Sequence, residues 1–158
     1  MSQLQVCEQP GPLTAHEAWA IVRPIVAAID PQARLTFITS GLDISHAGRS
    51  FTWEFMFYLP TRRAQALLSL APADDAEEID NAPLVLTQRI GPAGASAAGA
   101  PVLPLPFRDS PAVVAELAAG GVDFIAGPTD MKLEGRVLAT GEAVWLTNYW
   151  DDVRAVAW

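Results

Sequence analysis

The sequence feature that most constrains the fold is an alternation of large apolar residues in residues 49–59 (RSFTWEFMFYL). Alternation of this kind is typical of a β-strand with one face against a core, because successive side chains point to opposite sides of a sheet. We therefore expect this segment to have one core face and one outer face. The core face carries Phe51, Trp53, Phe55, Phe57 and Leu59, and the outer face carries Thr52, Glu54, Met56 and Tyr58.

A weaker copy of this pattern returns at Glu142–Trp150 (EAVWLTNYW), where Trp145 matches Trp53 and Tyr149 matches Phe57. Each aromatic strand follows a predicted helix. The first helix, Thr14–Ile29, begins with a capping box formed by Thr14 and Glu17. The second begins at Ser110, which we place at the N-cap with proline after it, and ends at a Gly-Gly pair.

The order helix, strand, long strand, strand thus occurs twice, which predicts an α+β fold with two helices packed on antiparallel sheet. We expect two related α-β-β-β halves. The predicted boundaries are an irregular N-terminal arm at 1–12, a first half at 13–90, a Gly/Ala/Pro-rich connector at 91–106 and a second half at 107–158. Chance similarity between the two aromatic strands is the alternative to a true repeat.

A helix followed by an antiparallel hairpin with a tryptophan in its middle strand resembles PepSY-like domains and, more loosely, cystatin-like α+β folds. Thr14–Ile29 and Ser50–Leu59 carry the likeness in the first half, and Ser110–Ala119 and Ala143–Trp150 carry it in the second. The resemblance implies a role in inhibition or binding and an exported or membrane-attached location, and it implies no catalytic residue.

Composition narrows the function classes. The chain has 158 residues, of which 51% are hydrophobic and 18% charged, with a net charge of −8. No basic cluster is present, which argues against nucleic-acid binding. The sequence also has no run of about 18 apolar residues, so we predict no membrane span. We see no signal peptide and expect a cytoplasmic protein. The high apolar content favours a homodimer or a protein partner, unless alanine alone inflates it.

Residues with catalytic or metal-binding chemistry are few. The chain has one cysteine, Cys7, and two histidines, His16 and His46. We expect His16 to be solvated at the start of the first helix, and His46 lies in a polar loop without the motif of a nucleophile turn. The acidic run Asp74–Asp80 lacks the spacing of a calcium loop and is predicted to be a solvated connection. We therefore predict no catalytic residue, no metal and no cofactor.

The outer face of the aromatic strands is the candidate binding surface. Met56, Tyr58 and Trp150 are expected to project away from the tryptophan side, and Asp130 and Lys132 either form a surface pair or line a pocket. The leading hypothesis is a non-catalytic protein-binding module, inhibitory or immunity-like. The alternative is a small apolar ligand-binding protein with a pocket between helix and sheet. An enzyme would require a deep polar cleft that joins His46 with Asp130 or Glu54.

Overall fold

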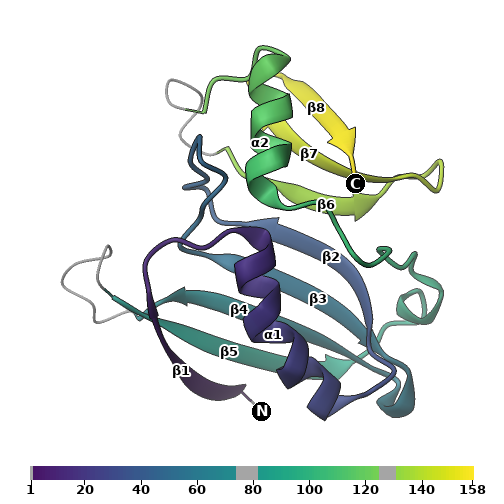
Figure 1. The fold of residues 1–158 in the computed structure, drawn as a ribbon. Coiled ribbons are helices and arrows are strands. Elements are labelled where there is room, and N and C mark those ends of the chain that lie inside the picture. Colours follow the sequence, from purple (N-terminus) through teal and green to yellow (C-terminus); the bar gives the residue numbers. More distant parts are fainter. Residues whose placement is uncertain (1, 74–81, 125–130) are drawn as a thin grey trace.

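The computed structural model describes residues 2–73, 82–124 and 131–158, with residues 2–10 described as backbone (Figure 1). An antiparallel sheet of eight strands in the order β1-β5-β4-β3-β2-β6-β7-β8 runs through the molecule. The strands are β1 (Ser2–Pro10), β2 (Arg34–Ser40), β3 (Trp53–Leu59), β4 (Ala64–Pro72), β5 (Pro83–Pro92), β6 (Glu134–Val137), β7 (Ala143–Tyr149) and β8 (Asp152–Ala157). Both helices lie on one face of this sheet, so the predicted α+β class with two helices is confirmed.

Helix α1 (Ala15–Ile29) covers the part of the sheet formed by β2–β5 (Figure 1). Its predicted capping box is present, because the Glu17 amide donates to the Thr14 hydroxyl and the Glu17 carboxylate accepts from the Thr14 amide. The apolar stripe buries Ala18, Val22 and Val26 against the core face of β3. This core face carries the predicted alternation, since every second residue from Trp53 to Leu59 is buried.

Helix α2 (Ser110–Ala119) lies over β6–β8 (Figure 1). Its N-cap is Asp109 rather than Ser110, which corrects the prediction by one residue. The Ser110 hydroxyl bonds elsewhere: it accepts from the Ala15 amide at 2.8 Å and donates to the Gly48 carbonyl at 2.6 Å. Asp109 accepts from the His16 amide at 2.9 Å. Residues at the start of α2 therefore satisfy the free amides at the start of α1 and hold the two halves together.

The sheet continues across the two halves through β2 and β6, where Ile38 pairs with Gly135 and Thr39 with Glu134. On the helix-covered face this pairing makes the core continuous, and Trp53 and Trp145 are both fully buried in it. Their surroundings differ in detail. The Trp53 indole donates to the Leu13 carbonyl at 2.9 Å, whereas the Trp145 indole N–H has no acceptor in the described part of the chain.

The N-terminal segment departs from the prediction, because residues 2–10 form β1 and not an irregular arm. The strand pairs antiparallel with β5 from Ser2↔Arg89 to Pro10↔Pro83. The physical reason is that β5 would otherwise leave a ten-residue edge unpaired, and covered edges are favoured. The Pro10-Gly11-Pro12 run ends the strand rather than preventing it.

The predicted connector, 91–106, includes the end of β5, which continues to Pro92, and a short 3-10 helix at Ala97–Gly99. Its apolar end is partly packed: Leu103 is buried and its amide donates to the Leu35 carbonyl at 2.8 Å, while Val102 and Leu105 are exposed. The acidic run Asp74–Asp80 and Asp130 lie outside the described residues. Among the residues that the structure does describe, no helix has the length and apolar character needed to cross a bilayer.

Candidate binding surface

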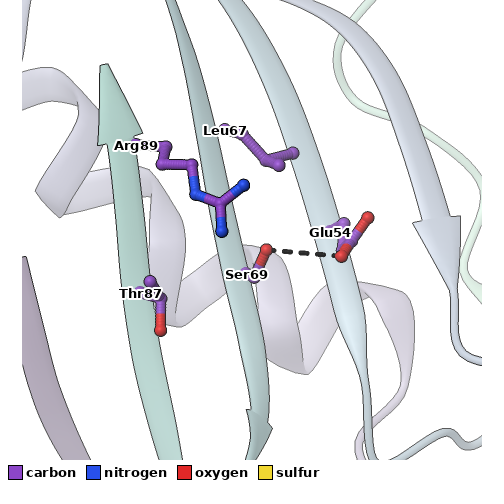
Figure 2. Close-up of a pocket in the computed structure, with 5 residues that line it drawn as sticks. All are labelled: Glu54, Leu67, Ser69, Thr87 and Arg89. Carbon is purple, nitrogen blue, oxygen red and sulfur yellow. Dashed lines mark hydrogen bonds between the residues drawn. The ribbon is translucent and has the colours of Figure 1, made fainter. Parts of the chain in front are cut away.

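No helix or strand that the structure describes covers the face of the sheet opposite the helices over β2–β5. Figure 2 looks onto this face, with the helix behind the strands and the labelled side chains in front of them. Most of its residues are half-buried, whereas Thr39 is buried and Arg89 exposed. They form rows across the strands, because partners in an antiparallel ladder point to the same side. These rows are the candidate site, and we call them the open face.

One row of the open face is polar. Thr39 pairs with Glu54, Glu54 with Ser69, and Ser69 with Thr87, so four polar side chains cross four strands side by side. The Ser69 hydroxyl donates to a Glu54 carboxylate oxygen at 3.5 Å (Figure 2). This long contact leaves most of the hydrogen-bonding capacity of the Glu54 carboxylate for other donors.

The next row is apolar and ends in a charge. Phe37 pairs with Met56, Met56 with Leu67, and Leu67 with Arg89. The first three side chains are half-buried and Arg89 is exposed. Tyr58 and Gln65 continue the face beyond this row, and the Gln65 amide lies 3.0 Å from the Met56 sulfur. The row therefore presents a contiguous strip of large apolar side chains to solvent.

A hollow of about 210 Å³ lies where the two rows meet, lined by Glu54, Leu67, Ser69, Thr87 and Arg89 (Figure 2). Its floor is the backbone of β3–β5 and its walls carry one negative and one positive side chain. Neither Glu54 nor Arg89 takes part in an ion pair with a described residue. The hollow is shallow, so it suits a side chain of a partner better than an enclosed ligand.

The structure brings together only some of the predicted site residues. Met56 and Tyr58 lie on the open face as expected. Lys132 pairs at 3.1 Å with Glu134, which lies on the same side of the sheet because it is aligned with Glu54 through Thr39. The predicted pair of Asp130 with Lys132 falls outside the described residues, since Asp130 does. Thr147 donates to the Lys132 carbonyl at 2.7 Å, which anchors the backbone before β6.

Trp150 lies apart from the others, in the turn between β7 and β8. The ladder pairs align Glu54 of β3 with Leu146 of β7, through Thr39 and Glu134. Tyr58 lies four residues beyond Glu54 and Trp150 four residues beyond Leu146. Because β3 and β7 run in opposite directions, these offsets of Tyr58 and Trp150 add. At about 3.4 Å per residue and about 4.8 Å per strand, the two are separated by roughly 27 Å along the strands and 14 Å across them. They do not form one surface.

Sequence reasoning missed Phe37, Leu67 and Arg89. The alternation of β4 and β5 could have located Leu67 and Arg89, because every second residue of β4 from Ala64 to Leu70 is buried. Phe37 could not be placed this way. An irregularity between Leu35 and Phe37 changes the side of the sheet on which successive residues fall, so Leu35 faces the core and Phe37 the open face.

A second hollow, of about 360 Å³, lies between α2 and the edge strand β8. Leu117 and Val122 border it on the helix side and Val156 on the strand side, with Glu116 and Arg154 at its rim. The hollow is open to solvent and lies beside β8, which is an edge strand of the sheet.

Two of the residues considered for catalysis form hydrogen bonds to other parts of the chain. Asp43, which neighbours His46 in sequence, accepts from the Ser50 hydroxyl at 2.6 Å and from the Phe51 amide at 2.9 Å. His16 is exposed, as expected, and in addition its Nε2 lies 2.5 Å from the Phe107 carbonyl and its ring contacts the Phe107 ring. In the described ranges no three His, Cys, Asp or Glu side chains are grouped as metal ligands would be.

Comparison of the chain with family models, with curated proteins and with solved structures gives no match. The resemblance to PepSY-like and cystatin-like domains therefore stays a prediction. Any functional assignment rests on the geometry of the open face and of the second hollow.

Proposed function

We propose that the chain is a non-catalytic protein-binding module and that the open face of β2–β5 is its binding surface. The observation that carries the proposal is the strip Phe37, Met56, Leu67, which leaves three large apolar side chains half-exposed on adjacent strands. Aromatic residues, Met and Arg are enriched in protein interfaces, and this strip ends at Arg89.

The polar surroundings of the strip support a protein partner over a membrane surface. Glu54 and Ser69 border it on one side and Tyr58 and Gln65 on the other, which matches an apolar centre with a polar rim. The net charge of −8 disfavours anionic lipid headgroups. Inhibition or immunity is the candidate role of such a module, and a cytoplasmic location remains a prediction.

A small apolar ligand is the second candidate, favoured by the hollow between α2 and β8. The interior below α1 offers less room, because Trp53, Phe55 and Phe57 fill it and are at most 1% exposed. A bound ligand would accompany the protein in native mass spectra, and this result would favour the second candidate.

The two halves also support a proposal about origin. Each contains a helix followed by three sequential antiparallel strands, β2–β4 in the first half and β6–β8 in the second, with a buried tryptophan in the middle one; the first half adds β5 as a fourth strand. We propose that they are related α-β-β-β units joined edge to edge through β2 and β6.

The protein-binding proposal is tested by comparing affinity purifications from the native host with quantitative mass spectrometry. Leu67→Glu introduces a charge into the apolar strip, and Ala27→Glu adds the same charge to the exposed side of α1 as a matched control. We expect a specific partner to be enriched with the wild type and the control and to be reduced at least tenfold with Leu67→Glu. Equal enrichment by all three would contradict the proposal, provided that urea unfolding shows Leu67→Glu to be folded.

A further inference from the structure

Strand β8 is an edge of the sheet. It pairs with β7 on one side, and on the other side no strand of the described chain covers it. Alternate residues of such an edge present free backbone N–H and C=O groups. Natural edges are commonly protected by charged side chains, proline or bulges, and the sequence DVRAVA carries the two charges of Asp152 and Arg154 but no lysine or proline.

The turn that leads into β8 carries an exposed tryptophan under backbone strain. Tyr149 pairs with Asp152, so Trp150 and Asp151 form a two-residue turn. Trp150 has φ +56 and is 68% exposed, in a turn position that usually holds glycine or asparagine. A bulky residue in this conformation is strained, and such outliers concentrate at functional positions.

The side chains of β8 divide cleanly between the two sides of the sheet. Val156 belongs to the core side, and so does Arg154, which donates to the Gly120 carbonyl at 3.3 Å at the end of α2. Asp152 shares this side and accepts from Arg154 at 3.2 Å. On the opposite side Val153 is 60% exposed. The edge thus presents an acidic and a basic residue two positions apart on one side and an apolar residue between them on the other.

We propose that β8 pairs with β8 of a second copy of this chain, antiparallel, around a two-fold axis at Val153. In a two-fold antiparallel pair with the axis perpendicular to the sheet, paired residues lie on the same side of the sheet, so the axis passes through a residue position. An axis at Asp152 or Arg154 places identical charges opposite each other, which is destabilising. An axis at Ala155 leaves both charges opposite uncharged residues.

Only the axis at Val153, among those within the charged part of the strand, gives opposite charges as neighbours. It places Asp152 of each copy beside Arg154 of the other, twice, and the two exposed valines side by side. The self-complementary charge pattern is what identifies a second copy, rather than an unrelated peptide, as the occupant of this edge. The two sheets then form one continuous sheet of sixteen strands, eight from each copy.

The same register gives Trp150 a partner. Counting outward from Val153, the turn that carries Trp150 in one copy lies beside the end of β8 in the other, where Val156 borders the hollow between α2 and β8. The exposed indole is thereby brought near the hollow of the second copy, which Leu117, Val122 and Val156 line beside Glu116 and Arg154. Burial of this indole offsets the backbone strain of Trp150.

This dimer uses a different surface from the open face, so either proposal can fail without the other. The test is the mass in solution, measured by light scattering on size-exclusion chromatography. The wild type is expected to be dimeric. Arg154→Asp and Asp152→Arg each place like charges opposite one another and are expected to be monomeric, whereas Glu142→Arg, in the exposed turn before β7, is expected to remain dimeric.

Two combinations separate pairing from local damage. The double variant Asp152→Arg/Arg154→Asp restores opposite charges and is expected to be dimeric again. An equimolar mixture of the two single variants places the two arginine side chains of one strand beside the two aspartate side chains of the other, and is expected to form a heterodimer. A monomeric wild type overturns the proposal, as do single variants that remain dimeric. A dimer lost in Leu67→Glu but kept in both charge variants would assign dimerisation to the open face instead.

Discussion

Gly48 tests whether the contact between the start of α2 and the loop before β3 holds the two halves together. Its φ is +72, a region that residues with a Cβ rarely adopt. A Cβ added there would lie 2.5 Å from Pro111 Cα and from Pro111 N and 2.6 Å from the Ser110 carbonyl carbon. All three are backbone atoms, so they cannot move aside as a flexible side chain would.

The expected cost of Gly48→Ala is the sum of two effects. Left-handed backbone strain contributes about 1–2 kcal/mol, and overpacking against the fixed backbone contributes about 1–3 kcal/mol. The total is about 2–5 kcal/mol. The clash also moves the Gly48 carbonyl away from the Ser110 hydroxyl that donates to it.

Gly141→Ala is the matched control. Gly141 has φ +89 and its added Cβ would have no heavy atom within 4 Å, so only the strain of about 1–2 kcal/mol applies. Equilibrium urea unfolding measures both variants, and a larger loss of stability in Gly48→Ala isolates the contact between the halves. Equal losses in the two variants would refute the reasoning that α2 packs tightly on this loop.

Two further substitutions test the core and the end of α1. Burial raises the pKa of the Asp30 carboxyl. Hydrogen bonds from the Gln32 amide and from the Thr61 hydroxyl and amide, together with the nearby Arg62, lower this pKa by more than burial raises it, so the pKa lies below its ordinary value. A lowered folded-state pKa gives stability that is present above the unfolded pKa of about 3.9 and is lost as pH falls through the folded pKa. The stability difference between wild type and Asp30→Asn should therefore shrink on acidification from about pH 5 to 2 in urea titrations, and a constant difference would contradict this. Trp53→Phe removes an indole donor that is hydrogen-bonded to Leu13, whereas Trp145→Phe removes an unpaired buried N–H, so Trp53→Phe should destabilise by about 2 kcal/mol more in thermal and urea unfolding. Equal costs would show that the Trp145 N–H is satisfied.

Local pattern predicts the strongly periodic elements. The alternation around Trp53 and the capping box at Thr14 each depend on neighbours in sequence, and the structure confirms both. The strand at the N-terminus is not predictable in this way, because its formation depends on the exposed edge of β5, about 80 residues away in sequence. The position of Phe37 depends on an irregularity in β2 that sequence periodicity cannot reveal.

The sequence predicts only those residues of the candidate site that the alternation within a single strand can place. Met56 and Tyr58 follow from the alternation of β3, but the rows that make up the open face require the register of four strands. Sequence alone groups Trp150 with them because of its residue type and its parity along the second aromatic strand. The order of strands places it at the far edge instead, beside β8.

The most direct measurement of the central claim, that the open face binds a protein, is site-specific photo-crosslinking in the native host. A photoreactive phenylalanine analogue replaces Leu67 on the open face or Ala27 on the exposed side of α1. The account predicts a discrete crosslinked product from position 67 that disappears when Arg89→Glu is added, and none from position 27. A product from position 27 alone, or the same products from both positions, would contradict it.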